Sequence, residues 1–331
     1  MSASLIAVAS ALPGEKVGNE FFSSELKDNK NPMFMGTEFR HHMGRQDKAS
    51  DLIADACKKI IGDLDLNPET DIDILMTNVS IPDQPFTGCG AVVSKVLGAK
   101  PKWIYDLSNT GCVSFVYMMD LAQTIMMARG ARSALICCAQ TAGGRIFALE
   151  GVKTKAQAAI PGDGCGVGYL VADDRAPIMA TVQRSFGEFS EDMYACFDDD
   201  RKWWEPGDSN GFIDFTESKT AKIMMRGNRA VPRVVKGACE EAGIKTSDID
   251  ILITNQPNTS FLRNWREALQ IPKDKHLDTF RQYANLFGAG IPVTLDEGVR
   301  IGKIKKDQVL CLAGFSHACD YAAATVLRWG E

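Results

Sequence analysis

Histidine is scarce in this sequence, and its few copies lack the spacing of metal ligands. His41, His42, His276 and His317 are the only four among 331 residues. None of them is spaced from a cysteine or a carboxylate in the way that zinc ligands are. The sequence therefore predicts that the protein holds no metal ion.

Long apolar runs and excess positive charge are also absent. No run reaches the roughly 18 uncharged apolar residues that a membrane-spanning helix needs. The net charge of -5 argues against a general affinity for nucleic acid or for anionic membranes. The N-terminal residues MSASLIAVASALPG contain no basic segment, so we expect a first strand and a Pro-Gly turn rather than a signal peptide.

The ten cysteines are scattered along the chain. Several of them, including Cys137, Cys138 and Cys311, lie in apolar runs that resemble buried strands. This distribution is typical of free thiols in a reducing compartment and not of a disulfide framework. We therefore expect a cytoplasmic protein.

One octapeptide occurs almost twice in the chain. Residues 71–78 read DIDILMTN and residues 248–255 read DIDILITN. Each copy follows a helical pattern, over residues 50–64 and 230–242, and a polar turn. Self-similarity at this spacing predicts that one α/β unit has been built twice. Helical and strand patterns alternate elsewhere too, which predicts a layered α/β architecture.

Cys112 is the first candidate for a catalytic role. It lies between a predicted strand, residues 103–106, and residues 113–129, which are apolar nearly all round and predict a helix at the centre of the molecule. At the start of that helix, free N–H groups and the helix dipole would lower the pKa of the thiol. A cysteine at such a junction is nevertheless more often a packing residue than a nucleophile.

Residues 188–218 interrupt the alternating pattern. They carry ten acidic and two basic residues, and Trp203 and Trp204 are among their aromatic residues. One interpretation is an exposed excursion that packs on its own aromatic side chains. The other is a lid over a substrate site, because long ordered loops are often functional.

Five motifs follow one another along the whole chain. They are DLSNTGCVSFVYMMDLA (106–122), PGDGCGVGYLV (161–171), NQPN (255–258), YANLFGAGIP (283–292) and LAGFSHACDYAAATVLRW (312–329). In this order they resemble β-ketoacyl-acyl-carrier-protein synthase III, a family of the thiolase superfamily. The resemblance implies a five-layered αβαβα fold of two similar halves. Residues 1–174 would form the half that carries Cys112, and residues 175–331 the half that carries Asn255, Asn285 and His317.

The resemblance also implies a mechanism. In that family a cysteine takes an acyl group from a thioester, and a histidine and an asparagine assist the decarboxylation of a malonyl thioester. Cys112 matches the nucleophile and Asn285 matches the asparagine. The family's HQAN motif reads NQPN here, so Asn255 stands in place of the histidine. An amide cannot accept a proton near neutral pH, although it can donate a hydrogen bond.

A histidine occurs instead in FSHACD (315–320), where the family has a glycine-rich loop beside the cysteine. We predict that His317 is the base, with Asp320 or Asn285 as its partner. The alternative is a buried histidine that fills space. Backbone N–H groups at Cys112 and in residues 315–318 are expected to hold an oxyanion. The other three histidines lie in polar stretches, and we expect them at the surface.

The family's substrate contacts match this sequence in part. Phe86 matches a position that lines the partner's acyl pocket across a homodimer. Asn228 and Asn258 match polar positions near the pantetheine tunnel. The adenine-binding tryptophan and arginine have no counterpart in residues 29–45, which favours a carrier-protein thioester over free coenzyme A. No permanently bound cofactor is implied.

Our leading hypothesis is an acyltransferase of a specialised pathway, related to fatty-acid, polyketide or other secondary-metabolite synthesis. It would form an acyl-Cys112 thioester from an acyl-carrier-protein or coenzyme A donor and pass the acyl group to an oxygen, nitrogen or carbon nucleophile. Two alternatives remain open. One is a decarboxylative condensing enzyme that uses Asn255 and Asn285 as hydrogen-bond donors. The other is a non-catalytic subunit of a heterodimeric synthase.

Overall fold

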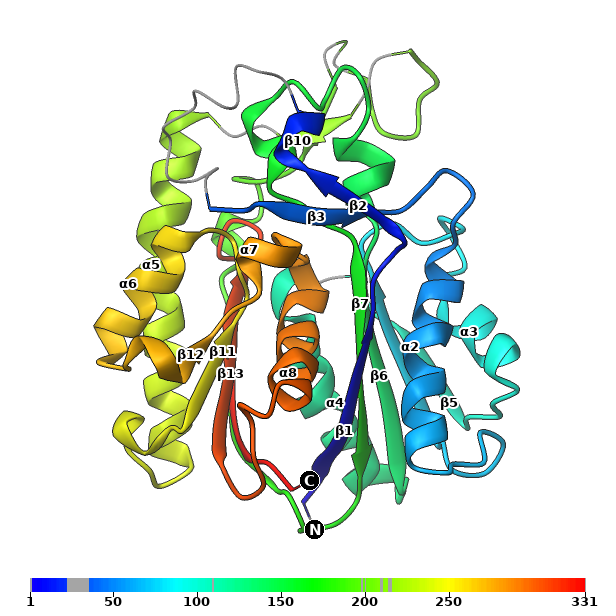
Figure 1. Cartoon of the computed structure of the whole chain (residues 1–331), viewed down its shortest axis with the longest axis vertical. Helices are drawn as coiled ribbons and strands as arrows, with labels where there is room; N and C mark the ends of the chain where they lie inside the picture. Colours follow the sequence, from blue (N-terminus) through cyan, green and yellow to red (C-terminus); the bar gives the residue numbers. More distant parts are fainter. Residues whose placement is uncertain are drawn as a thin grey trace.

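The computed structural model describes residues 2–22, 36–108, 110–197, 199, 201–208, 211–213 and 216–330. Residues 29–35, part of the region predicted to lack the adenine-binding residues, lie outside this range. In the described part, two five-stranded sheets face each other across a pair of central helices, and further helices cover their outer faces (Figure 1). The order of layers is therefore αβαβα, as predicted.

The first sheet has the strand order β1-β7-β6-β4-β5. Its strands are Ser4–Ala11 (β1), Ile74–Val79 (β4), Trp103–Asp106 (β5), Ser133–Gln140 (β6) and Gly164–Val171 (β7). β4 pairs in parallel with β5 and β6, whereas β7 runs antiparallel to β1 and β6. β6 is buried along its whole length, which explains its continuous apolar run.

The second sheet repeats this arrangement, with the order β8-β14-β13-β11-β12. Its strands are Ile178–Ser185 (β8), Ile251–Thr254 (β11), His276–Leu277 (β12), Val309–Ser316 (β13) and Tyr321–Arg328 (β14). β11 pairs in parallel with β12 and β13, as β4 does with β5 and β6. The two copies of the octapeptide thus form the same strand of two equivalent sheets, and the predicted duplication is confirmed.

The predicted boundary at residues 174 and 175 falls between β7 and β8, which belong to different sheets. The division of the chain into two halves at this point stays a prediction, and the membership of the sheets supports it.

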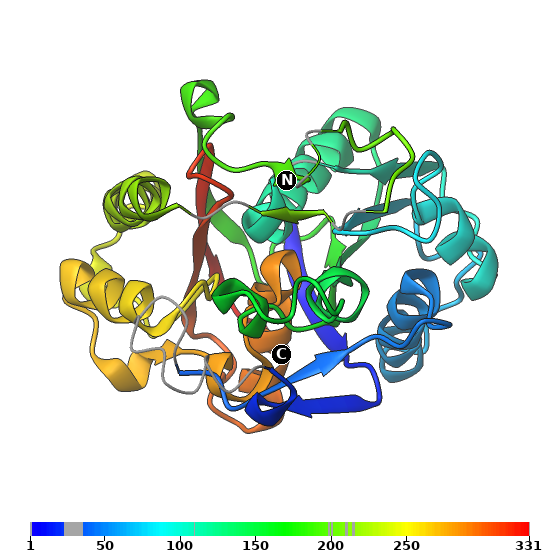
Figure 2. The same ribbon diagram turned by 90° about the horizontal axis from the view of Figure 1, so that it is seen from above.

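Helices form the other three layers (Figure 1 and Figure 2). Ala49–Asp63 (α2) and Gly90–Leu97 (α3) lie outside the first sheet, and Glu217–Glu241 (α5) and Thr259–Leu269 (α6) lie outside the second. Ser114–Arg129 (α4) and Gly290–Arg300 (α8) lie between the sheets, and Phe280–Tyr283 (α7) is a single turn. α5 begins earlier than the predicted residue 230, because its first half is a polar surface helix without a continuous apolar face.

The position of the central helix explains its composition. With the preceding turn it spans Gly111–Arg129, the one helix of the described chain that is long and apolar enough to cross a membrane. Phe115, Met118 and Met119 are fully buried in the core between the two sheets. Burial of each such side chain contributes about 1.5–3 kcal/mol. A place in the protein core therefore accounts for a helix that is apolar on every side.

Shorter strands form the end of the molecule above the sheets. Glu15–Gly18 (β2) pairs with Phe39–His42 (β3), and Ala195–Cys196 (β9) pairs with Phe212–Ile213 (β10). β9 and β10 belong to the acidic excursion of residues 188–218. Figure 1 shows both pairs above the ends of the central strands.

The expectation that three histidines lie at the surface is wrong for two of them. His42 in β3 and His276 in β12 are only 3% and 5% exposed. Burial lowers the pKa of each to about 4. His276 Nε2 lies 3.0 Å from Thr254 Oγ1. Each of these two histidines lies in a short strand that enters the core. Their polar neighbours in the sequence do not indicate this burial.

Candidate active site

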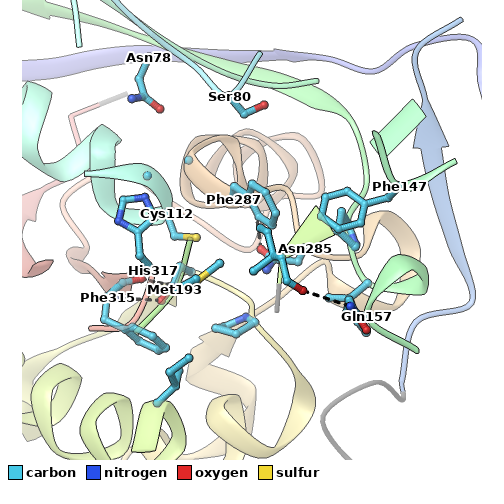
Figure 3. A pocket seen from close by; sticks show the side chains of 18 of the residues that line it. Asn78, Ser80, Cys112, Phe147, Gln157, Met193, Asn285, Phe287, Phe315 and His317 are labelled. Atoms are coloured by element: carbon cyan, nitrogen blue, oxygen red, sulfur yellow. Dashed lines mark hydrogen bonds between the residues drawn. The ribbon is translucent and has the colours of Figure 1, made fainter. Parts of the chain in front are cut away.

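A cavity of about 300 Å³ lies where the two halves meet, and both halves contribute to its walls. Cys112 and Asn78 come from the first half, and Asn255, Asn285 and His317 come from the second. Figure 3 shows the side chains of Cys112, Asn285 and His317 around this one space. The remaining wall is largely apolar and includes Val79, Ala139, Phe147, Ile160, Pro161, Met193, Ile213, Ile223, Pro257, Phe261, Phe287 and Phe315.

A constrained turn presents the nucleophile. Thr110 has φ 66°, a conformation that is unusual for a β-branched residue, and Gly111 has φ 35°. Cys112 follows in a 3-10 turn that leads directly into α4. Ser114 Oγ donates to Asn78 Oδ1 at 2.9 Å, and Asn78 Nδ2 donates to the Leu107 carbonyl at 2.8 Å. The end of β4 therefore fixes the start of the helix that follows the nucleophile.

The prediction of a lowered pKa for Cys112 is wrong for this structure. Burial raises the pKa of its thiol to about 12, and the negative charge of Asp320 acts in the same direction. A hydrogen bond from the Asn255 side chain favours the thiolate but does not outweigh burial. Cys112 is therefore a thiol at neutral pH, and it needs a proton acceptor before it can attack.

His317 provides a proton acceptor beside this turn. Its Nδ1 lies 3.2 and 3.1 Å from the two carboxylate oxygens of Asp320. Because a carboxylate only accepts hydrogen bonds, Nδ1 carries the proton of the neutral ring, and Nε2 keeps its lone pair. A Cβ placed on Gly111 would lie 2.8 Å from Nε2. Gly111 thus allows the imidazole to approach the backbone next to Cys112.

The loop that carries His317 is also held in an uncommon conformation. His317 has φ 50° and Cys319 has φ 74°. Non-glycine residues with a left-handed backbone cost on the order of 1–3 kcal/mol each and persist where the surroundings hold them. The Cys319 N–H donates to the Ser316 carbonyl at 2.8 Å across the turn. β13 ends before this loop and β14 begins after it, so the two strands fix His317 at the cavity.

Asn255 lies directly after β11 and is fully buried. Its Nδ2 donates to the Phe315 carbonyl at 2.9 Å, and its Oδ1 accepts from the Phe315 N–H at 3.3 Å. The same side chain lies close enough to the Cys112 thiol to lower its pKa. Asn255 therefore orients β13 and the nucleophile, but its amide cannot take the proton of the thiol.

Asn285 also lines the cavity and is 7% exposed. Its backbone N–H donates to the Ile160 carbonyl at 2.9 Å, and its Oδ1 accepts from the Phe287 N–H at 3.0 Å. These bonds fix the side chain and leave Nδ2 as the group that can donate to a substrate. The structure thus brings four predicted residues, Cys112, Asn255, Asn285 and His317, to one cavity, with Asp320 behind His317.

Of the described residues, the three predicted substrate contacts do not line this cavity, and their roles at a pantetheine tunnel and across a dimer stay predictions. Among the described residues that line the cavity, neither Asn228 nor Asn258 occurs. Asn258 is buried as the N-cap of α6, where its Oδ1 accepts from the Phe261 N–H at 3.0 Å. Asn228 accepts from Asn264 Nδ2 at 3.3 Å and lines a separate surface hollow. Helix capping and helix packing therefore occupy these two amides. Phe86 is 89% exposed, away from the cavity of its own chain.

The acidic excursion contributes to the cavity, which favours the lid interpretation. Met193 and Ile213 from this segment line the cavity, and Gln157 Nε2 donates to the Ile213 carbonyl at 3.2 Å. None of these three residues could be identified from the sequence, because they meet only through the folding of separate loops. Asn78 was missed as well, although it ends the first copy of the octapeptide as Asn255 ends the second.

Two family models match the chain. The model of 3-oxoacyl-[acyl-carrier-protein (ACP)] synthase III matches residues 105–187, and the model of its C-terminal part matches residues 239–329. The chain belongs to this family. The synthase III family is one of enzymes of the thiolase superfamily, so the predicted family and fold are confirmed.

Similar proteins extend over nearly the whole chain. A β-ketoacyl-[acyl-carrier-protein] synthase III of Clostridium perfringens is 26% identical over 297 residues, which cover 87% of each chain. A solved 3-oxoacyl-(acyl carrier protein) synthase III of Pseudomonas aeruginosa is 22% identical, with a TM-score of 0.85 and coverage of 100% and 99%. A solved OleA variant of Xanthomonas campestris is 17% identical, with a TM-score of 0.84 and coverage of 99% and 97%. These structures share the fold of the chain.

Proposed function

We propose that the chain is an acyl-transferring enzyme that uses Cys112 as nucleophile and His317, held by Asp320, as proton acceptor. The observation that carries this proposal is the position of the imidazole. Asp320 holds its Nδ1, and its Nε2 faces the backbone of Gly111, next to Cys112. Asn255, at the position of the family histidine, cannot accept a proton.

In the first step the Cys112 thiol transfers its proton to His317 Nε2, and the sulfur attacks the carbonyl carbon of an acyl thioester. Backbone N–H groups at Cys112 and in residues 315–318 stabilise the resulting oxyanion. The carbon–sulfur bond to the carrier then breaks, and His317 returns the proton to the departing carrier thiol. The products are acyl-Cys112 and a free carrier thiol.

In the second step His317 takes a proton from an acceptor that bears an O–H, an N–H or an acidic C–H group. The acceptor attacks acyl-Cys112, and the sulfur leaves as a thiolate that takes the proton back from His317. The names of the relatives favour a carrier-protein thioester as donor, and coenzyme A is the other source of the same phosphopantetheine thioester. We infer a specialised pathway, because the family histidine is replaced.

Decarboxylative condensation is the second candidate, because the relatives are named β-ketoacyl synthases. Asn285 lies in the cavity and could donate to a malonyl thioester carbonyl. Incubation with an acyl thioester, with and without a malonyl thioester, separates the candidates. Our proposal predicts an acyl adduct by intact mass without carbon dioxide release. Steady release coupled to carbon–carbon bond formation would establish condensation, and no adduct with any donor would favour a non-catalytic subunit.

We also infer a homodimer that forms at the free edge of the first sheet. β5 is an edge strand, and Ile104 on it is 38% exposed. Val92 and Val96 of α3 are 42% and 43% exposed, and Phe86 lies in the loop that precedes α3. An apolar sheet edge of this kind is typical of a covered interface. A cytoplasmic location fits the ten cysteines, all within the described residues and all free thiols.

A further inference from the structure

Arg226 connects two segments that are far apart in the sequence. It lies on α5, and its Nη1 contacts Asp192 Oδ2 at 2.5 Å. Its guanidinium lies 3.7 Å from the centre of the Phe189 ring, and Nη1 makes a longer contact of 3.5 Å with the Ala318 carbonyl. Arg226 and Asp192 are largely shielded, with side chains 17% and 23% exposed. One side chain therefore joins the acidic excursion to the loop of His317.

The two residues that Arg226 contacts, Asp192 and Ala318, are each next to a residue of the active site. Asp192 precedes Met193, which lines the cavity, and Ala318 follows His317. A second contact joins the same two segments. The Phe186 N–H donates to the Asp320 carbonyl at 2.7 Å. Phe186 in turn stacks on Phe189, with ring centres 5.6 Å apart. Residues 186–192 and the His317 loop are thus held together around the Arg226 side chain.

We propose that Arg226 is a positioning residue for proton transfer, which holds the His317 loop in its working geometry and joins it to the segment that ends in Met193 of the cavity wall. This inference rests on the proposed role of His317. The loop needs such support because His317 and Cys319 both have left-handed backbones. An arginine is required because its planar group can stack on Phe189 while its N–H groups reach Asp192 and Ala318.

A double-mutant cycle tests the inference in the full-length protein. Turnover of an acyl thioester with a fixed acceptor is measured for the wild type, Arg226→Ala, His317→Ala and the double variant. We expect Arg226→Ala to lower kcat about tenfold in the wild-type background and to change it less than about twofold in His317→Ala, because residues that act as a unit are not additive. Arg226→Lys should restore part of the loss, since it keeps the ion pair but not the stacking.

Arg229→Ala is the matched control. Arg229 is exposed one turn further along α5, and it has no hydrogen bond or ion pair with the described residues, so the kcat of this variant should be unchanged. If Arg226→Ala does not fold, Asp192→Ala removes the ion pair and the hydrogen bond to Arg226 without altering α5, and it should show the same dependence on His317. Normal activity of His317→Ala would refute the proposed function. An equal Arg226→Ala effect with and without His317, or none at all, would refute this inference alone.

Discussion

Asn78 and Asn255 lie at the carboxyl end of the same strand in the two halves of the molecule, and they hold different parts of the active site. Asn78 accepts a hydrogen bond from Ser114 and so fixes the start of the helix that follows Cys112. Asn255 bonds to Phe315 and so fixes the strand that leads to His317. Asn78 therefore fixes only the backbone that follows the nucleophile, whereas Asn255 fixes the strand of the proton acceptor and also acts on the Cys112 thiol.

The turns that follow show a similar contrast. Before α4 the chain forms the 3-10 turn Gly111–Val113 with the nucleophile, and before α8 it forms the 3-10 turn Phe287–Ala289, which Asn285 precedes. β13 and β14 are joined by a tight turn with His317, whereas β6 and β7 are separated by residues 141–163. Duplication therefore provides a common scaffold, and the connections between its strands provide the chemistry.

Removal of the nucleophile should have the largest effect. Cys112→Ala is expected to abolish the acyl adduct and to lower turnover on the order of 10⁴-fold or more, because no second nucleophile forms the acyl-enzyme. Intact-mass analysis after incubation with an acyl thioester measures the adduct. An adduct that persists on the variant would show that the first half does not supply the nucleophile through Cys112.

A methyl group added at Gly111, where the two halves meet, should have the second largest effect on turnover. In Gly111→Ala the new Cβ would clash with Ser316 Oγ and lie 2.8 Å from His317 Nε2, so both Ser316 and the imidazole would be displaced. We expect turnover to fall about 10- to 100-fold, as for small misplacements of catalytic groups. Gly130→Ala is the control, because it also has a positive φ of 65° but meets nothing within 4 Å. Equal turnover of the two variants would contradict the close approach of the two halves.

Substitution of Asn78 and substitution of Asn255 should have different kinds of effect. Asn78→Ala and Asn255→Ala each remove buried hydrogen bonds and should cost about 1–3 kcal/mol of unfolding free energy. Asn255→Ala should also slow the acylation of Cys112 about tenfold, since its side chain favours the thiolate. Denaturant titration and the rate of adduct formation measure the two effects. Slower acylation in Asn78→Ala but not in Asn255→Ala would show that Asn78, and not Asn255, acts on the Cys112 thiol.

The last and smallest effect at neutral pH concerns the buried histidines, one in each half. The pKa of His42 and of His276 is lowered to about 4, so the unfolded chain takes up protons first as the pH falls below 6.5. Unfolding free energy should therefore decrease from pH 6.5 toward pH 4, by on the order of 2–3 kcal/mol for each histidine. Denaturation series of His42→Gln and His276→Gln should show shallower slopes. A free energy that rises on acidification would contradict this.

The fold could be predicted from the sequence because the repeated octapeptide and the periodic patterns are local signals. Cys112 and Asn285 could be identified because they lie in contiguous motifs, and His317 could be paired with Asp320 because they are three residues apart. The predicted pKa of Cys112 was wrong, since burial outweighs the helix terminus. The contacts of Arg226 could not be predicted, because they join residues that are 34 and 92 positions apart.

The rate of Cys112 acylation in His317→Ala tests the central claim most directly. Rapid mixing with an acyl thioester, followed by intact-mass analysis, gives this rate without a known acceptor. We predict a rate at least about 100-fold below that of the wild type, in a variant that melts at an unchanged temperature. Acylation at the wild-type rate would show that His317 does not accept the proton of Cys112.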